Sequence, residues 1–291
     1  MSAMTDASSV TDLPPIVQRT GSLRPRPKWL LAAPRVLWGA CIAVILFYVA
    51  LPTLFVFPLA LTGGDVLTFP PQSLSLVHIQ NVIADVMWRN AFVTSIQVAL
   101  MAALIAAVIG TTLAAVIPRR GWLRVSLEAT VALPLVIPPV VLAVAWFGPW
   151  SSLSLLYTPL GVAITHAFLG LPFVYLNVAG AINSLDPQLP LAARSLGARP
   201  AVVFTRITLP LVVPGIIAGV VLTLIFSFDE LILALFLGGG AVATLPVSIW
   251  GQIQYATSPD IAAVAMIATL LTISAVGLAL GIQVAMRRRG R

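Results

Sequence analysis

Residues 207–228 read ITLPLVVPGIIAGVVLTLIFSF, and this stretch decides the fold class of the 291-residue chain. Its 22 residues carry no charge and lie between Arg206 and Asp229. About 20 apolar residues in a helix cross the hydrocarbon core of a bilayer. The stretch therefore predicts a membrane-spanning helix that runs into two consecutive acids, Asp229 and Glu230.

Most of the remaining chain has the same character. Hydrophobic residues make up 59% of it and charged residues 9%, against about 25% charged in a soluble domain. A soluble protein could not hide this much apolar surface, and a single cysteine, Cys41, disfavours a secreted disulfide scaffold. Further uncharged runs of 29, 29, 57, 29 and 26 residues lie at 36–64, 90–118, 129–185, 231–259 and 261–286.

These runs predict an all-α membrane protein with six transmembrane helices. The 57-residue run is long enough for two crossings and is divided at the turn-like sequence GPWSS of residues 148–152. Glycines 238–240 interrupt the run that follows Glu230, so 238–260 is interpreted as a loop with a short interfacial segment, a seventh helix being the alternative. Loop 61–89 carries either a short surface helix or no regular structure. The predicted spans are about 36–60, 90–116, 127–147, 160–182, 212–237 and 262–285.

The positions of lysine and arginine predict the orientation. With six spans, 15 of the 16 basic residues fall on one side, and only Arg89 falls on the other. By the positive-inside rule, that side and both termini are cytoplasmic. Residues 1–34 are then a mostly disordered cytoplasmic tail, and 35–291 form the transmembrane domain. The net charge of +7 is thus explained by the basic residues on the cytoplasmic side of the spans, which argues against a nucleic-acid partner.

The cytoplasmic segment 183–211 is longer than a simple connection. Asp186 followed by Pro187 is typical of a helix start, and Gly197 stands where a glycine ends a helix. Pro200 can begin a second helix. Two short helices bent about a glycine suit docking on a soluble partner, or resting on anionic lipid through Arg194, Arg199 and Arg206.

The same segment carries a recognisable motif. It reads LAARSLG at 191–197, then nine residues, then ITLP at 207–210. This resembles the EAA loop of type I ABC importer permeases, with Leu191 in place of the family's glutamate. The resemblance covers about residues 36–286 and is most similar to the spermidine/putrescine permeases. The supporting stretches are LPLVIPPV at 133–140, HAFLGLPF at 166–173, SFDE at 227–230 and LPVSIW at 245–250.

The resemblance implies a non-catalytic inner-membrane subunit, without metal or cofactor, that forms half of a two-permease channel. Two cytoplasmic ATPase subunits would hydrolyse ATP, since this chain has no phosphate-binding Gly-x-x-x-x-Gly-Lys-Ser/Thr loop. A solute-binding protein outside would deliver the substrate. The residues implied to couple the chain to the ATPases are Leu191, Ala192, Ala193, Arg194, Gly197, Ile207, Leu209 and Pro210.

Asp229, Glu230 and Phe228 are the candidate pathway residues. An acid inside a span is costly and usually marks a pathway or a paired site. Neighbouring residues on a helix point about 100° apart, so one acid is expected to line the pathway and attract a cation, with Phe226 and Phe228 adding cation–π contacts, while the other pairs across helices. Interfacial solvation or a structural hydrogen bond is the alternative. His166 is interpreted as structurally hydrogen-bonded.

The expected substrate is a small solute, with polyamine favoured by the two acids and an anion or iron as alternatives. Two other classes are weaker. A secondary transporter would show internal repeats and coupling-ion sites, and an intramembrane hydrolase would need a nucleophile with a base. The sequence shows neither pattern.

Overall fold

The computed structural model describes residues 28–118, 121–255 and 258–289. This part of the chain is helical, and its only β-pairing is an isolated bridge between Thr62 and Leu74. Helix α1 spans Lys28–Ala60, so it begins inside the predicted tail 1–34, and residues 1–27 lie outside the described part. Contacts divide the chain into two units, 1–52 and 53–291, with the boundary within α1.

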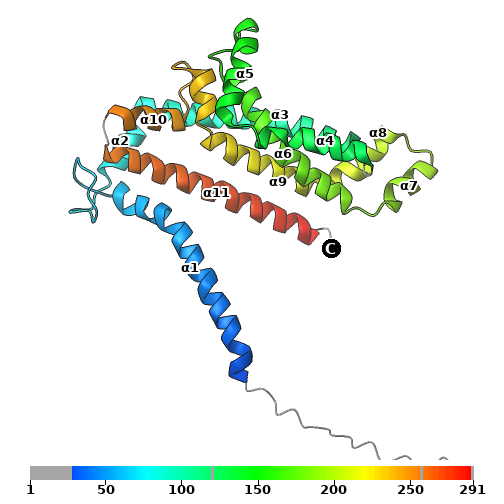
Figure 1. Cartoon of the computed structure of the whole chain (residues 1–291), viewed down its shortest axis with the longest axis horizontal. Coiled ribbons are helices and arrows are strands. Elements are labelled where there is room, and N and C mark those ends of the chain that lie inside the picture. The colour runs from blue at the N-terminus through cyan, green and yellow to red at the C-terminus, as the bar shows by residue number, and fades with distance from the viewer. Residues whose placement is uncertain (1–27, 119–120, 256–257, 290–291) are drawn as a thin grey trace, which may run out of the picture. The chain divides into compact units, whose positions relative to one another are not determined.

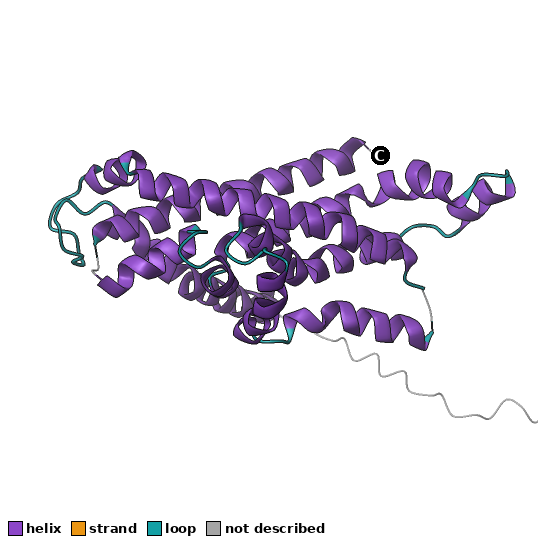
Figure 2. Ribbon diagram, turned by 90° about the horizontal axis from the view of Figure 1, so that it is seen from above, coloured by secondary structure: helices purple, strands orange, loops and turns teal. Residues whose placement is uncertain are grey.

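Within the second unit, the long helices run side by side along one direction (Figures 1 and 2). One end of this bundle carries α7 and α8, and the other carries α2 and α10 (Figure 1). The helices are α2 (Val77–Ala84), α3 (Val86–Val116), α4 (Trp122–Ala132), α5 (Pro139–Ser152), α6 (Pro159–Asn183), α7 (Gln188–Ser195), α8 (Pro200–Val203), α9 (Leu209–Asp229), α10 (Leu245–Tyr255) and α11 (Pro259–Arg289).

Five helices of the described residues are long and apolar enough to cross a membrane, and a bent pair makes up to six. The five lie at 37–60, 86–116, 159–183, 200–229 and 259–285. Four of them coincide, to within a few residues, with the first, second, fourth and sixth predicted spans. The third predicted span corresponds to the bent pair, and the fifth, 212–237, differs from the observed helix at 200–229. Helix α10 has 11 residues, about half of what a crossing needs, so the seventh-span alternative is wrong. Helix α2 is the short helix expected in loop 61–89.

The predicted third span, 127–147, is wrong as a single helix. Helix α4 continues through the single turn η1 (Leu133–Leu135) and then turns by 96° into α5. Pro138 and Pro139 stand at this corner, and a proline has no N–H to continue a helical ladder. Helix α5 also runs through the sequence GPWSS to Ser152, so the break before α6 lies after the position predicted for it.

The predicted fifth span, 212–237, is wrong at both ends. One continuous helical segment runs from Pro200 through the π-helical turn η2 (Phe204–Thr208) to Asp229. Pro210 cannot donate to the carbonyl four residues earlier, and the turn before it widens, with the Leu209 N–H donating to Phe204 O. At the other end the helix stops at Asp229, and a separate π-helical turn, η3 (Ala234–Gly238), follows.

Glycines bring α3, α6 and α9 into close contact around Val174. A Cβ atom at Gly219 of α9 would lie 2.5 Å from the Cα atom of Val174, and one at Gly110 of α3 would lie 2.9 Å from its Cβ atom. The Thr223 hydroxyl donates to the Gly170 carbonyl at 3.1 Å across the same α6–α9 interface. Small residues let helix backbones approach closely, which is how helices gain packing energy in a membrane. These three helices are therefore the structural core of the second unit.

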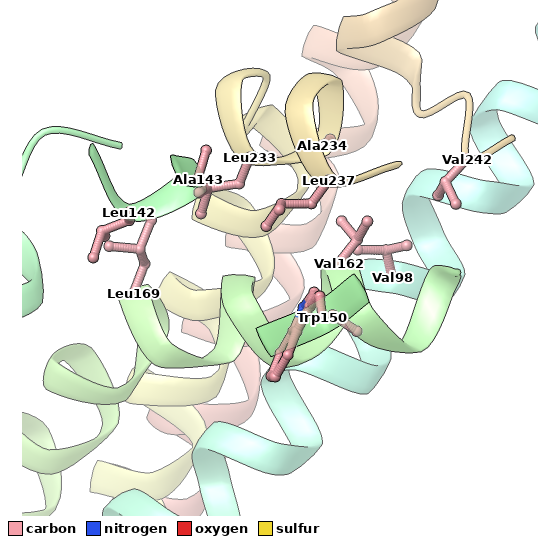
Figure 3. Packing of buried hydrophobic residues seen from close by; sticks show 11 residues of the cluster. Val98, Leu142, Ala143, Trp150, Val162, Leu169, Leu233, Ala234, Leu237 and Val242 are labelled. Atoms are coloured by element: carbon pink, nitrogen blue, oxygen red, sulfur yellow. The ribbon is translucent and has the colours of Figure 1, made fainter. Parts of the chain in front are cut away.

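Helix α5 and η3 pack together against α6 through one apolar cluster (Figure 3). Trp150 is buried in it, and its indole N–H donates to the carbonyl of Gly161 at 2.9 Å. Leu237 of η3 is fully buried, and its carbonyl accepts the N–H of Tyr157 at 2.8 Å. This packing fixes η3, and with it the break that follows Asp229.

Candidate functional site

The break in the fifth span lies between the two acids. Asp229 is the last residue of α9, and Glu230 has extended backbone, with φ −74° and ψ 117°. The Glu230 carboxylate accepts the backbone N–H groups of Ile232 (3.1 Å) and Leu233 (2.8 Å). This is the geometry of a helix N-cap, so Glu230 ends one helical segment and begins the next.

Asp229 is exposed and lines a cavity of about 650 Å³ between α9, α10 and α11. Phe228, Trp250, Thr269 and Thr272 are among the other lining residues. Asp229 is the only charged side chain among the described residues that line this cavity. The cavity lies toward α10, at the opposite end of the bundle from α7 (Figure 1).

Glu230 is buried, 8% exposed, and does not line that cavity. His166 of α6 faces it, with Nε2 3.4 Å from Glu230 Oε2. The other ring nitrogen of His166, Nδ1, is 2.8 Å from the Ser227 hydroxyl oxygen. Asp229 thus faces a cavity and Glu230 faces a polar group on a neighbouring helix, and the expectation that one acid lines the solute pathway stays a prediction. Which acid does which depends on the break, which the sequence did not predict.

The two phenylalanines of the predicted cation site separate. Phe228 lines the cavity. Phe226 instead packs against the ring of Phe173, with ring centroids 5.5 Å apart, and against the apolar cluster of α5 and η3. A cation–π role for Phe226 in this cavity is therefore wrong. Trp250 supplies the second aromatic ring of the cavity wall.

The segment with the glycine-centred motif forms the two predicted short helices. The Asp186 side chain accepts the Gln188 N–H at 2.9 Å at the start of α7. Gly197 has φ +83°, and the N–H groups of Gly197 and Ala198 donate to the carbonyls of Arg194 and Ala193. This pair of bonds is a Schellman motif, which confirms that Gly197 ends the helix. Pro200 then begins α8.

Helix α7 has no buried residue. Leu189 and Leu191 are 47% and 55% exposed, and Leu196 after the helix is 89% exposed. Ala192 and Arg194 are exposed and Ala193 is half-buried, while Ile207 and Leu209 are half-buried in the helical segment that leads into α9. The exposed motif residues of α7 are thus free to contact another molecule, and the later ones anchor the segment to the bundle.

Ser95 makes a structural contact beside the candidate site that sequence reasoning missed. This buried serine of α3 accepts the backbone N–H of Leu245 at 2.7 Å and so caps α10, which forms one wall of the Asp229 cavity. The two residues are 150 positions apart. The sequence around a serine in an apolar helix does not indicate which distant backbone group the hydroxyl will bind.

The family comparison covers most of the second unit. Residues 106–289 match the family described as binding-protein-dependent transport system inner membrane component. The chain belongs to this family. The permease is accordingly a transport subunit of an ABC importer for a small solute and resides in the inner membrane as a multi-pass protein.

Curated relatives differ in the solute that they carry. The permease is 32% identical over 203 residues to the molybdenum transport system permease protein ModB of Mycobacterium tuberculosis, covering 64% of this chain and 76% of the relative. It is 31% identical over 211 residues to the putrescine transport system permease protein PotI of Escherichia coli K12, covering 67% and 71%.

Solved structures show the same fold. A bacterial ABC transporter that imports the acidic polysaccharide alginate superposes with a TM-score of 0.60 at 14% identity, over 85% of this chain and 94% of the other. An alginate transporter in complex with an alginate-bound periplasmic protein gives 0.60 at 18% identity, over 90% and 96%. The all-helical ABC importer permease fold expected from the sequence is confirmed.

Proposed function

We propose that the permease imports a small organic cation of the polyamine class. The observation that carries this proposal is the cavity of about 650 Å³ in which Asp229 is the one charged side chain among the described lining residues. A carboxylate in a partly apolar site attracts ammonium groups, and the rings of Phe228 and Trp250 add cation–π attraction to the same cation. The resemblance to putrescine permeases supports the same class of solute.

Molybdate is the second candidate, because a relative at 32% identity is a molybdenum permease, against 31% for the putrescine permease. An oxyanion is bound by arginine, lysine or converging N–H donors. The described lining of the Asp229 cavity has no lysine, arginine or histidine, and its carboxylate would repel an anion. The charge of the cavity therefore favours the cation.

The proposed assembly contains a second permease subunit, two cytoplasmic ATPase subunits and an extracytoplasmic solute-binding protein. The exposed side chains of Leu191 and Arg194 on α7 support an ATPase docking role for segment 183–211, since they are not covered by other described residues of this chain. The alginate transporter with its periplasmic protein supports the binding-protein partner. The motion of α7 would pass to α9 through the continuous helical segment that starts at Pro200.

Substrate class is tested by uptake into proteoliposomes that contain the complete transporter and its binding protein. Radiolabelled putrescine should accumulate with ATP inside, and radiolabelled molybdate should not. The substitution Asp229→Asn keeps the size of the side chain and removes its charge. It should raise the KM for putrescine about tenfold, as loss of roughly 1.4 kcal/mol of attraction predicts.

The matched control is Asp65→Asn, which removes an exposed acid that does not line the cavity. Its uptake should equal that of the wild type. Molybdate accumulation by the wild type, or an unchanged putrescine KM in Asp229→Asn, would contradict the proposal.

A separate prediction concerns the missing glutamate of the docking motif. Because Leu191 is exposed, Leu191→Glu should leave the fold intact and add an ionic contact to the ATPase. We expect the ATPase to dissociate about threefold more slowly, as an exposed ion pair of 0.2–1 kcal/mol allows. Leu189→Glu makes the same charge change on another face of α7 and should not slow dissociation. Equal dissociation rates in both variants would show that position 191 is not a contact point.

A further inference from the structure

A buried polar cluster joins α6 to the break after α9. It consists of His166, Ser227 and Glu230, whose exposed fractions are 0%, 4% and 8%. His166 lies between the other two, with Nδ1 on the Ser227 hydroxyl at 2.8 Å and Nε2 3.4 Å from Glu230 Oε2. Ser227 and Glu230 stand on opposite sides of the break, so one imidazole contacts the chain before it and after it.

The Glu230 carboxylate is hydrogen-bonded at both of its oxygens. Both of its carboxylate oxygens accept backbone N–H groups of the segment that leads into η3, one from Ile232 and one from Leu233. A buried carboxylate is tolerated only when it is hydrogen-bonded or paired. His166 Nε2 has no hydrogen-bond partner within the described residues, and the Glu230 carboxylate oxygen Oε2 lies 3.4 Å from it.

The anchoring of Glu230 determines where its neighbour points. Along an unbroken α9 the two acids would differ only by the ordinary helical rotation of about 100°. Here the extended backbone of Glu230 separates them, so Glu230 turns into the protein and Asp229 turns to the cavity. Without the contact to α6, Glu230 would be held only by the N–H groups of its own segment, and Asp229 beside it would be less tightly placed.

We propose that His166 is a positioning residue for the cavity. It holds Ser227 and Glu230 on the two sides of the break, and this fixes the direction in which position 229 faces. The effect on transport rests on the proposed function, whereas the effect on the geometry at position 229 does not. The two can therefore be tested separately.

The geometric test uses thiol accessibility in the complete transporter. Cys41 is the chain's single cysteine, so Cys41→Ser gives a background in which Asp229→Cys introduces the only thiol of the permease. A water-soluble cationic methanethiosulfonate reagent should modify that thiol. Adding His166→Asn should slow the modification about fivefold, because alignment of a site is lost when its support is displaced by about 1 Å.

Two controls separate positioning from loss of structure. The side-chain amide of glutamine reaches the place of Nε2 and keeps the Glu230 side of the contact, whereas the shorter asparagine reaches only the place of Nδ1 and keeps the Ser227 side. The thiol at position 229 should therefore be modified faster with His166→Gln than with His166→Asn. Thr272→Cys places a thiol in the same cavity on α11, away from the break. Its rate should not change with His166→Asn.

Equal rates at position 229 with and without His166→Asn would overturn the proposal. So would a parallel loss of rate at positions 229 and 272, which indicates general loosening. For transport, His166→Asn should raise the KM for putrescine about fivefold with the maximal ATPase rate unchanged. If the thiol results hold but Asp229→Asn leaves putrescine uptake unaltered, the proposed substrate class is wrong and the positioning role of His166 stands.

Discussion

Gly219→Ala should lower the stability of the permease by about 3 kcal/mol, the upper end of the usual cost of overpacking. The added Cβ would lie 2.5 Å from the Cα atom of Val174 and 3.0 Å from the carbonyl oxygen of Phe173, so α6 and α9 must separate to admit it. Both of these atoms belong to the backbone and cannot move aside by a change of rotamer. The melting midpoint of the purified permease in nanodiscs measures the loss.

Gly180→Ala on α6 is the matched control, because a Cβ at this position meets no atom within 4 Å. Alanine favours a helix over glycine by about 1 kcal/mol, so this variant should be as stable as the wild type or more so. Equal midpoints for the Gly219 and Gly180 variants would show that close approach of α6 and α9 does not hold the core together.

A side-chain contact at the same place should behave differently. A Cβ at Gly110 would meet the Cβ and Cγ1 atoms of Val174 at 2.9 Å. Shortening Val174 to alanine removes Cγ1, so Val174→Ala should partly rescue Gly110→Ala. It should not rescue Gly219→Ala, whose closest contact is the Val174 backbone. The double-mutant cycle thus reports which part of Val174 each glycine meets.

The sequence predicts membrane spans well because a span is a property of composition. An uncharged run of about 20 residues has few alternatives to a crossing helix, and the runs at 90–118 and 261–286 contain α3 and α11 almost entire. The predictions from short-range sequence patterns at the ends of α7 and at the start of α8 are also confirmed. Asp186, Gly197 and Pro200 each act through their own backbone or a neighbour within a few residues, so no knowledge of the fold is needed to interpret them.

The breaks in the third and fifth spans could not be predicted in the same way. Pro138 and Pro139 predict a kink. The 96° turn into α5 also goes with a hydrogen bond from the Trp150 indole to the Gly161 carbonyl on the next helix, which the sequence does not indicate. Likewise, the Ser-Phe-Asp-Glu sequence gives two adjacent acids without indicating which one is buried. Glu230 is the buried one and faces His166, 64 positions earlier, and a contact across that separation is a property of the folded chain.

Gly197→Val should abolish transport while leaving the permease folded and in the membrane. Gly197 has φ +83°, a left-handed conformation that a β-branched side chain disfavours strongly. A Cβ there meets nothing within 4 Å, so the effect arises from backbone conformation alone and not from a clash. Losing the Schellman turn redirects α7 relative to α8, and the proposed link from the ATPase to α9 is broken.

Gly197→Asn is the control at the same position, because asparagine tolerates the left-handed region much better than valine. It adds a longer polar side chain in the same open space and should keep more than about half of the wild-type uptake, since its conformational cost is well below the 1–2 kcal/mol of an ordinary residue. Transport and the stimulation of ATP hydrolysis by loaded binding protein are measured on both variants in proteoliposomes. Equal activity of the valine and asparagine variants would show that coupling does not depend on the turn at Gly197. Loss in both would show that the motif needs the bare glycine surface against the ATPase, a contact requirement and not a conformational one.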